Sequence, residues 1–270
     1  MKIYFRHYAG AITEYDYLFF DCMAKVGSYE EELALQEGWL PDDYTEPKKM
    51  SNNCEEDKSD WYQARQTRID LSLFREDRKT RKTRKKCKDI TTKVFRATEV
   101  DLNILNSIFD KYINYRGFKT WELEPLIKRE KHRKHFILYY YNDKPIAFTF
   151  IRDVGSFDSF ATQFAWDYEM PKLYLGKYAN LAEIDYCIAK NKKYMYIGAG
   201  YEKACIYKSD YTGFEFWTGE KWSKDVEHYK FLCERDSSIV KTQELDEIKE
   251  HDDKFFFDKY LNSGYNNIDK

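Results

Sequence analysis

The sequence lacks the residue patterns that mark several common kinds of site. Its six cysteines include no C-x-x-C pair, and they form no Cys/His quartet with the spacing of a zinc site. No Ser-His-Asp, G-x-S-x-G or P-loop pattern is present. His132 and His135 have a metal-like i, i+3 spacing, but no acidic partner stands at a recognised offset. We therefore expect no metal site, no serine-hydrolase site and no P-loop.

The chain also lacks long hydrophobic runs. The longest apolar stretches, such as FILYYY at 136–141, are far shorter than a membrane-spanning helix. No basic segment followed by an apolar segment begins the sequence. Cysteines without a pairing motif are most simply interpreted as those of a reducing compartment. These absences predict a cytoplasmic protein that has no membrane partner.

A strong local concentration of positive charge is present instead. The chain of 270 residues carries a net charge of −2, yet residues 75–88 hold nine Lys or Arg, two acids and no large apolar residue. A helix built from this stretch would have no apolar face to bury. We therefore expect either a solvated helix or a surface that binds polyanions.

Aromatic residues are abundant as well. They make up 18% of the chain, with 24 Tyr and 19 Phe. Their rings supply mass for a core, and they also provide surfaces on which nucleobases stack. A general compositional bias is the alternative explanation. The length suffices for one large domain or two small ones.

Hydrophobic periodicity predicts both strands and helices before the basic stretch. The expected elements are short strands within 3–22, a helix over 28–39, a polar surface loop over 40–60 and a strand over 64–74. Ser28 and Glu31 have the spacing of a helix capping box. In the last strand, Ile69, Leu71 and Leu73 alternate with polar residues, so we expect these three on one face.

The order of elements after the basic stretch indicates a fold class. The expected elements are a strand over 94–98, helices over 99–116 and 121–131, a hairpin at Asn142-Asp143, a strand over 159–166, a helix over 174–191, strands over 194–200 and 213–219, and an acidic helix over 242–262. This is the order of the GNAT acyltransferase fold. We predict an α+β protein with a mostly antiparallel mixed sheet flanked by helices, plus a small N-terminal subdomain. The predicted parts are the N-terminal subdomain with the basic helix at 1–92, the GNAT-like catalytic domain at 93–235 and an acidic C-terminal helix at 236–270.

Two segments resemble a known family. DYEMPKLYLGKYANLAEI, residues 167–184, is similar to a motif of the aminoacyl-tRNA protein transferases, which include arginyl-transferring enzymes and bacterial leucyl-transferring relatives. The matching positions are Asp167, Leu175, Gly176, Tyr178, Glu183 and Ile184. YIGAGYEKACIYKSDYTGFEF resembles a second motif, with matches at Tyr196, Gly198, Cys205, Tyr207 and Lys208. EEELALQEGWLP and the strand with the basic helix resemble upstream parts, so the resemblance reaches from about residue 28 to about residue 222.

The sequence also departs from the family pattern. The family usually carries a C-x-x-C associated with a metal or iron-sulfur site, where this chain has MSNNCEEDKSDWYQ with Cys54 alone. The family's Asp-Pro is Asp167-Tyr168, and its Ser-Leu-Gly begins at Tyr174. These departures leave the amino acid and the acceptor open. The CoA-binding loop of GNAT enzymes is not matched either, because Tyr178 stands where that loop has a small residue.

The resemblance and the residue chemistry give a candidate site. We predict Glu183 and Asp153 as catalytic residues. The predicted substrate-binding residues are Asp167, Tyr174, Gly176, Tyr178, Tyr207 and Lys208. The predicted tRNA-binding residues are Arg68, Arg75, Arg78, Arg81, Lys82 and Lys85. The plainer alternatives are a structural hydrogen bond for Glu183, a solvated strand end for Asp153, an ordinary helix-start glycine and an exposed loop for Tyr207 and Lys208.

The resemblance implies an aminoacyltransferase. It would move an amino acid, arginine or leucine in the family, from aminoacyl-tRNA to the amine of a protein or peptide. The aminoacyl ester is already activated, so alignment, oxyanion stabilisation and proton removal suffice, and aminoacyl-tRNA is a co-substrate with no further cofactor. Two alternatives stay open: a CoA-dependent GNAT N-acyltransferase, and a non-catalytic RNA-binding protein.

Overall fold

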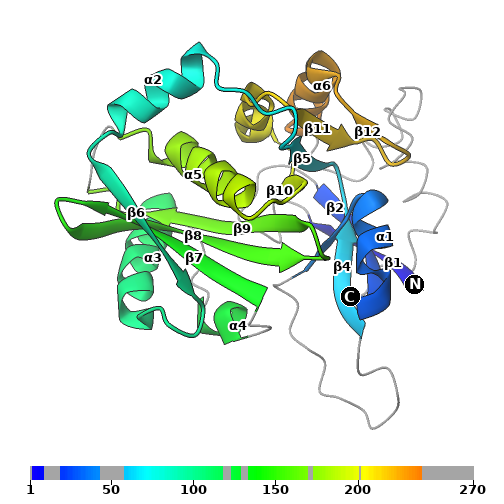
Figure 1. Cartoon of the computed structure of the whole chain (residues 1–270). Coiled ribbons are helices and arrows are strands. Elements are labelled where there is room, and N and C mark those ends of the chain that lie inside the picture. Colours follow the sequence, from blue (N-terminus) through cyan, green and yellow to red (C-terminus); the bar gives the residue numbers. More distant parts are fainter. Residues whose placement is uncertain are drawn as a thin grey trace, which may run out of the picture. The chain divides into compact units, whose positions relative to one another are not determined.

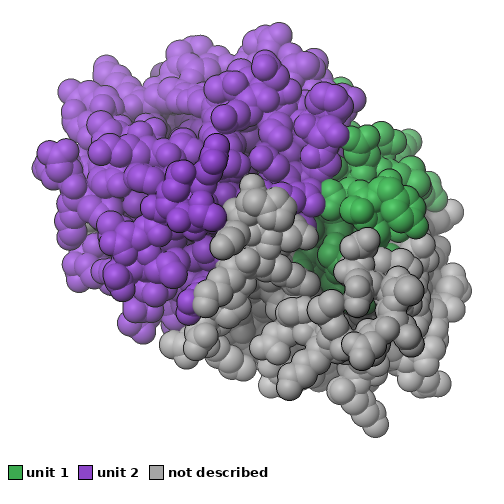
Figure 2. All heavy atoms as spheres, turned by 60° about the horizontal axis from the view of Figure 1, so that its bottom comes forward, with its two compact units in different colours: residues 1–68, 197–210, 214–270 green, residues 69–196, 211–213 purple. Residues whose placement is uncertain are grey.

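The computed structural model describes residues 2–8, 19–42, 58–117, 123–128, 133–169, 173–200 and 202–238 (Figure 1). The chain divides into two compact units, coloured separately in Figure 2. Unit 1 is Met1–Arg68, Ile197–Asp210 and Phe214–Lys270, and unit 2 is Ile69–Tyr196 and Tyr211–Gly213. The domain boundaries expected from the sequence, after residues 92 and 235, stay a prediction. The expected helix over 242–262 lies outside the described residues.

Unit 2 is built on a mixed sheet. Its antiparallel strands are β6 (Ile90–Arg96), β7 (Lys134–Tyr141), β8 (Lys144–Val154) and β9 (Asp158–Trp166). β10 (Tyr194–Ala199) pairs with β9 in parallel, at Met195↔Ser159 and Tyr196↔Phe160. β7 and β8 join through Asn142 and Asp143, whose φ angles of 49° and 60° suit the tight hairpin that the sequence predicts.

Helices cover both faces of this sheet. They are α2 (Arg78–Lys86), α3 (Leu102–Arg116), α4 (Leu123–Lys128) and α5 (Leu175–Ala189). α3 and α4 lie on one face and α5 lies on the other, with α2 beside α5 (Figure 1). The order is a strand, two helices, three antiparallel strands, a helix and a parallel strand. It confirms the predicted α+β, GNAT-like class.

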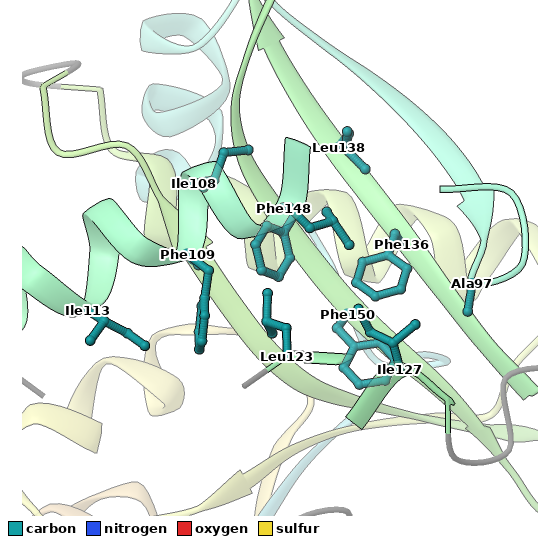
Figure 3. Packing of buried hydrophobic residues seen from close by; sticks show 12 residues of the cluster. Ala97, Ile108, Phe109, Ile113, Leu123, Ile127, Phe136, Leu138, Phe148 and Phe150 are labelled. Carbon is teal, nitrogen blue, oxygen red and sulfur yellow. The ribbon is translucent and has the colours of Figure 1, made fainter. Parts of the chain in front are cut away.

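The core of unit 2 lies between the sheet and helices α3 and α4. Phe136, Phe148 and Phe150 point toward these helices and are fully buried (Figure 3). The rings of Phe136 and Phe150 stack with centroids 4.9 Å apart. Each buried ring contributes roughly 1.5–3 kcal/mol of hydrophobic stabilisation. Because side chains alternate along a strand, Ile137 and Tyr139 of β7 point to the opposite face, toward α5.

Unit 1 contains a second sheet, with strand order β1-β2-β4-β3. These strands are β1 (Lys2–Tyr8), β2 (Phe19–Gly27), β3 (Trp39–Pro41) and β4 (Lys58–Gln63). The other elements with residues in this unit are η1 (Ser28–Glu30), α1 (Glu31–Gln36), β5 (Gln66–Asp70), η3 (Lys203–Asp210), β11 (Phe214–Trp217), β12 (Trp222–Ser223) and α6 (Val226–Asp236). Unit 1 also contains a buried ion pair, in which Arg65 donates to Asp236 at 2.7 Å.

Three local expectations were wrong. The ends of the predicted 40–60 loop are strands, because β3 and β4 pair with each other. The first helical turn is capped by Glu30, which accepts the backbone N–H of Gly27 at 2.9 Å, rather than by a Ser28/Glu31 box. The strand expected over 64–74 ends at Asp70, whose carboxylate accepts the backbone N–H of Ser72 and forms a turn. Leu73 is therefore 44% exposed instead of sharing a buried face.

Among the described residues, no helix is both long enough and apolar enough to span a membrane.

Candidate active site

The first turn of α5 is the centre of the candidate site. Gly176 lies in this turn, and a Cβ at its position would be 3.0 Å from the ring of Trp166. The glycine therefore permits close packing of the helix start on the end of β9. Tyr174 immediately precedes the helix and is 48% exposed. The Lys86 ammonium lies 3.8 Å from its ring centroid. A hydrogen bond with Lys86, and the charges of Lys86 and other nearby lysines, lower the pKa of Tyr174.

The basic helix α2 has a narrow buried face of small residues, and one of its arginines holds it to α5. Thr80, Thr83 and Cys87 are buried, so the expectation that this helix has no face to bury was wrong. Burial raises the pKa of the Cys87 thiol. Arg84 donates two hydrogen bonds to the carboxylate of Asp185 on α5, at 2.7 and 2.8 Å. These contacts turn the remaining cations of α2 outward.

The outward cations include most of the predicted tRNA-binding residues. Arg78, Arg81, Lys82 and Lys85 are exposed on α2. Arg75 precedes the helix and is exposed too, although its guanidinium donates to the carbonyl oxygens of neighbouring residues at 2.6 and 3.0 Å. Unit 2 thus brings five of the six predicted residues to one stretch of surface at and before α2.

Three of the predicted binding residues lie in unit 1. Arg68 is buried, donates to Glu215 at 2.7 Å and stacks 3.8 Å from the ring centroid of Trp222. Tyr207 is 38% exposed on η3. Lys208 is buried and donates to the carbonyl oxygen of Ala199 at 2.6 Å.

Glu183 is a buried carboxylate with an unusual pKa. It lies on the face of α5 that meets the sheet and is 2% exposed. Burial raises its pKa to about 7, against a smaller opposing effect of a hydrogen bond with Thr149. The Thr149 hydroxyl lies 2.9 Å from the hydroxyl of Tyr139. Within the described residues, Oε2 of Glu183 has no hydrogen-bond partner. Such a group exchanges a proton near neutral pH.

Asp153 has a different environment, at the end of β8. Its carboxylate accepts from Lys192 at 2.9 Å and from the Ser159 hydroxyl at 3.0 Å, and it lies 3.3 Å from Nε2 of His135. Burial alone would raise its pKa, but the hydrogen bonds from His135, Lys192 and Ser159 lower it. Asp153 is thus an ionised group on β8 that contacts β7, β9 and the segment before β10.

Asp167 and Tyr178 complete the predicted set in unit 2. Asp167 is buried and accepts from Lys111 at 2.9 Å and from the backbone N–H of Glu169 at 3.0 Å. Burial opposes ionisation, but the hydrogen bond from Lys111 is the main reason that its pKa is lowered overall. The ring of Tyr178 meets that of Tyr139 edge to face, 6.1 Å apart, and burial raises the Tyr178 pKa.

The parallel pairing of β9 with β10 lies near the start of β9. In the described residues β9 pairs with β10 at Ser159 and Phe160 alone, and residues 161–166 run on beyond the last pair. This end of β9 leads toward Gly176 and the N-terminus of α5.

Comparison with known proteins identifies the family. Residues 72–218 match the family described as arginine-tRNA-protein transferase, C terminus. The chain belongs to this family. The match covers more than half of the chain and includes α2, the sheet of unit 2 and α5, whereas Arg68 lies outside it. No curated protein sequence matches the chain.

The solved structures that resemble this chain have low sequence identity to it. L-PGS from Bacillus licheniformis is 11% identical, with a TM-score of 0.45 over 66% of this chain and 54% of that one. The C-terminal domain (DUF2156) of a putative lysylphosphatidylglycerol synthetase from Agrobacterium fabrum is 11% identical, with a TM-score of 0.43 over 51% and 47%. FemX is 10% identical, with a TM-score of 0.42 over 66% and 63%. The chain thus covers about half the length of the first two.

Sequence reasoning missed the residues that surround the predicted ones in this family member. Thr149 and Tyr139 form the hydroxyl pair beside Glu183, and Trp166 packs on Gly176. A signal for Thr149 was present, because it is a lone hydroxyl residue within an apolar strand. Trp166 had the period-two spacing of aromatic residues along β9, with Phe164 two residues before it.

Within the described residues, no three His, Cys, Asp or Glu side chains gather in a way that could hold a metal ion.

Proposed function

We propose that this chain is an aminoacyltransferase that moves an amino acid from aminoacyl-tRNA to an amine of a protein or peptide. The observation that carries the proposal is the cationic helix α2, held beside α5 by Arg84 and Asp185 and with Lys86 at the start of α5, in a member of the arginine-tRNA-protein transferase family. Arginine is the amino acid that we propose, because the family is named for it. Aminoacyl-tRNA is the donor, and the proposal includes no further cofactor.

The RNA-binding part of the proposal rests on α2 and the first turn of α5. Lys82 and Lys85 are exposed, and Lys86 lies against Tyr174 at the start of α5. The first backbone N–H groups of a helix have no partner within it and favour an anion. Phosphates of the acceptor stem would contact the lysines and arginines of α2, which gives affinity without sequence selection.

The chemical step needs a proton acceptor. The acceptor amine forms a C–N bond with the aminoacyl carbonyl carbon, and the ester C–O bond to the tRNA ribose breaks. The nitrogen of a neutral amine loses one proton as the amide forms, and a base takes this proton and returns it to the ribose oxygen as that oxygen leaves. We propose Glu183 as that base, reached through the Thr149 hydroxyl, because its pKa of about 7 suits proton transfer at neutral pH. Asp153 has a positioning role in this proposal, since Lys192 and Ser159 already occupy its carboxylate.

The test compares donors. The purified chain is incubated with labelled arginyl-tRNA, with a pool of other aminoacyl-tRNAs, or with labelled acetyl-CoA, each with a mixture of peptides that have free N-termini. We expect label on peptides from arginyl-tRNA. Transfer from acetyl-CoA alone would contradict the proposal in favour of a GNAT N-acyltransferase. Binding of tRNA without transfer from any donor would favour a non-catalytic RNA-binding protein.

A variant links the reaction to Glu183. Glu183→Gln keeps the size of the side chain but removes the base, so we expect the transfer rate to fall by roughly 100- to 10,000-fold. The affinity for tRNA should stay the same, because α2 is unchanged. Equal rates in the two proteins would exclude Glu183 as the proton acceptor.

A further inference from the structure

Tyr115 and Tyr168 form a stacked pair of rings at the surface of unit 2. Tyr115 lies in the last turn of α3, and Tyr168 follows the end of β9. Their ring centroids are 3.7 Å apart and their planes differ by 13°. Tyr115 is nevertheless 67% exposed. Since Tyr168 covers one side of the Tyr115 ring, that exposure belongs largely to its other side.

The pair is the outer end of a row of aromatic rings. Tyr168 meets Trp166 with centroids 4.9 Å apart, and Trp166 meets Phe164 at 5.3 Å. Trp166 in turn packs on Gly176 in the first turn of α5. The row thus runs from an exposed ring to the helix start where Lys86 and Tyr174 lie.

Core packing explains the inner rings but not the outer one. Trp166 and Phe164 are partly covered by neighbours, as expected for rings that join a helix to a sheet. A Tyr that served packing alone would have its ring covered, whereas Tyr115 is among the most exposed large hydrophobic residues described. A planar ring with one open face accepts another planar ring on that face.

The surrounding charges suit a nucleotide. Asp167 and Glu169 lie near the pair, but Lys111, one turn before Tyr115 on α3, donates to both carboxylates at 2.9 Å. Lys144 lies 3.7 Å from Asp167 as well. Two cations therefore balance the two acids beside the stack, and the exposed cations of α2 add positive charge near the other end of the aromatic row.

We propose that the open face of Tyr115, backed by Tyr168, stacks an unpaired base at the 3′ end of the tRNA. The inference rests on the proposed function and specifies where the single-stranded end of the donor binds. Stacking on an aromatic side chain tolerates any base, and each stacked base contributes measurably to affinity for single-stranded RNA. The phosphates of the stem would lie on α2, and the unpaired nucleotides would lie along the aromatic row between the start of α5 and Tyr115.

The test uses an RNA hairpin with four unpaired nucleotides at its 3′ end and a blunt hairpin with the same stem. Fluorescence anisotropy measures the affinity of the chain for each. We expect the tailed hairpin to bind more tightly, and Tyr115→Ala to weaken its binding by roughly 5- to 100-fold while leaving the blunt hairpin unchanged. Tyr115→Phe keeps the ring and should bind both hairpins as the unchanged chain does. Tyr29→Ala removes an exposed ring of unit 1 and should change neither affinity.

A second measurement reports stacking directly. With 2-aminopurine at each of the four unpaired positions in turn, binding should quench the fluorescence of the base that stacks on Tyr115, and Tyr115→Ala should abolish that quenching. Equal binding of the two hairpins, or an equal effect of Tyr115→Ala on both, would overturn the inference. Failure of arginyl transfer with an intact Tyr115-dependent preference for the tail would refute the proposed function and leave this site standing. Transfer without that preference would refute the site alone.

Discussion

At the scale of single residues, Glu183 makes stability depend on pH. Burial raises its pKa to about 7, from the ordinary value of 4.5. Between these values the folded state holds a proton that the unfolded state has released, so stability falls as pH rises through this interval. The shift corresponds to about 3 kcal/mol. The free energy of unfolding, measured with urea, should be lower at about pH 8 than at about pH 5. In Glu183→Gln, which cannot ionise at this position, the fall should be smaller by about 3 kcal/mol. The same pH dependence in both proteins would contradict the burial argument.

Motif spacing indicates candidate site residues but not the residues that they contact. Glu183, Gly176 and Tyr178 were predicted through motif spacing, and all three lie on α5. The partner Thr149 could not be found in that way, because it comes from β8 and meets Glu183 through the fold. Asp153 was predicted as a catalytic residue, and nothing in the sequence indicated that Lys192 pairs with its carboxylate. A sequence shows which side chains can ionise, and the neighbours that decide their ionisation are distant in the chain.

At the scale of elements, α2 depends on a narrow packed face. Thr83 is buried there, so Thr83→Lys places a long charged side chain into the contact with α5. We expect faster amide hydrogen exchange throughout α2 and weaker binding of tRNA, although the charge of the chain rises by one. Thr98→Lys adds the same charge at an exposed turn and is the control. If Thr83→Lys strengthened tRNA binding, charge alone would govern this surface and its attachment to α5 would not matter.

Elements that adjacent residues determine were predicted correctly, whereas elements that depend on distant contacts were missed. The turn at Asn142-Asp143 is decided by residues that tolerate positive φ, so the hairpin was predicted correctly. β3 and β4 were missed because they are short and exist through pairing with each other and with β2. The buried face of α2 was missed because Thr and Cys carry it rather than large apolar residues.

At the scale of the whole molecule, unit 1 is assembled from separated segments of the chain. Arg65 and Asp236 are 171 residues apart and form a buried ion pair at 2.7 Å. Asp236→Asn removes the negative charge that Arg65 and Arg235 both contact, so the free energy of unfolding should fall by about 3 kcal/mol. The double variant Arg65→Met/Asp236→Leu should recover part of that loss, because Arg235 keeps its charge. Chemical denaturation followed by tryptophan fluorescence measures both, and a loss below about 1 kcal/mol for Asp236→Asn would show that the pair is not required.

The sequence does not indicate that these separated segments form one unit. Unit 1 consists of the first 68 residues and of later segments that begin at Ile197. Motif order therefore indicated the GNAT-like part well, because that part is nearly continuous from Ile69 to Tyr196. Arg65 and Asp236 carry no local signal of their pairing, and an ion pair between distant positions becomes visible through the fold alone.

The whole chain has a net charge of −2, so any attraction to RNA must come from local surfaces. Binding to tRNA should weaken as salt rises, with a log-log slope of about −0.7 to −0.9 for each phosphate contact. Arg81→Gln/Lys85→Gln should therefore make the slope shallower by roughly 1.4–1.8. Lys93→Gln/Arg96→Gln removes the same charge from exposed positions on β6 and should leave the slope unchanged. Equal slopes for the two double variants would mean that overall charge governs binding, whereas a change confined to the α2 variant would assign the phosphate contacts to that helix.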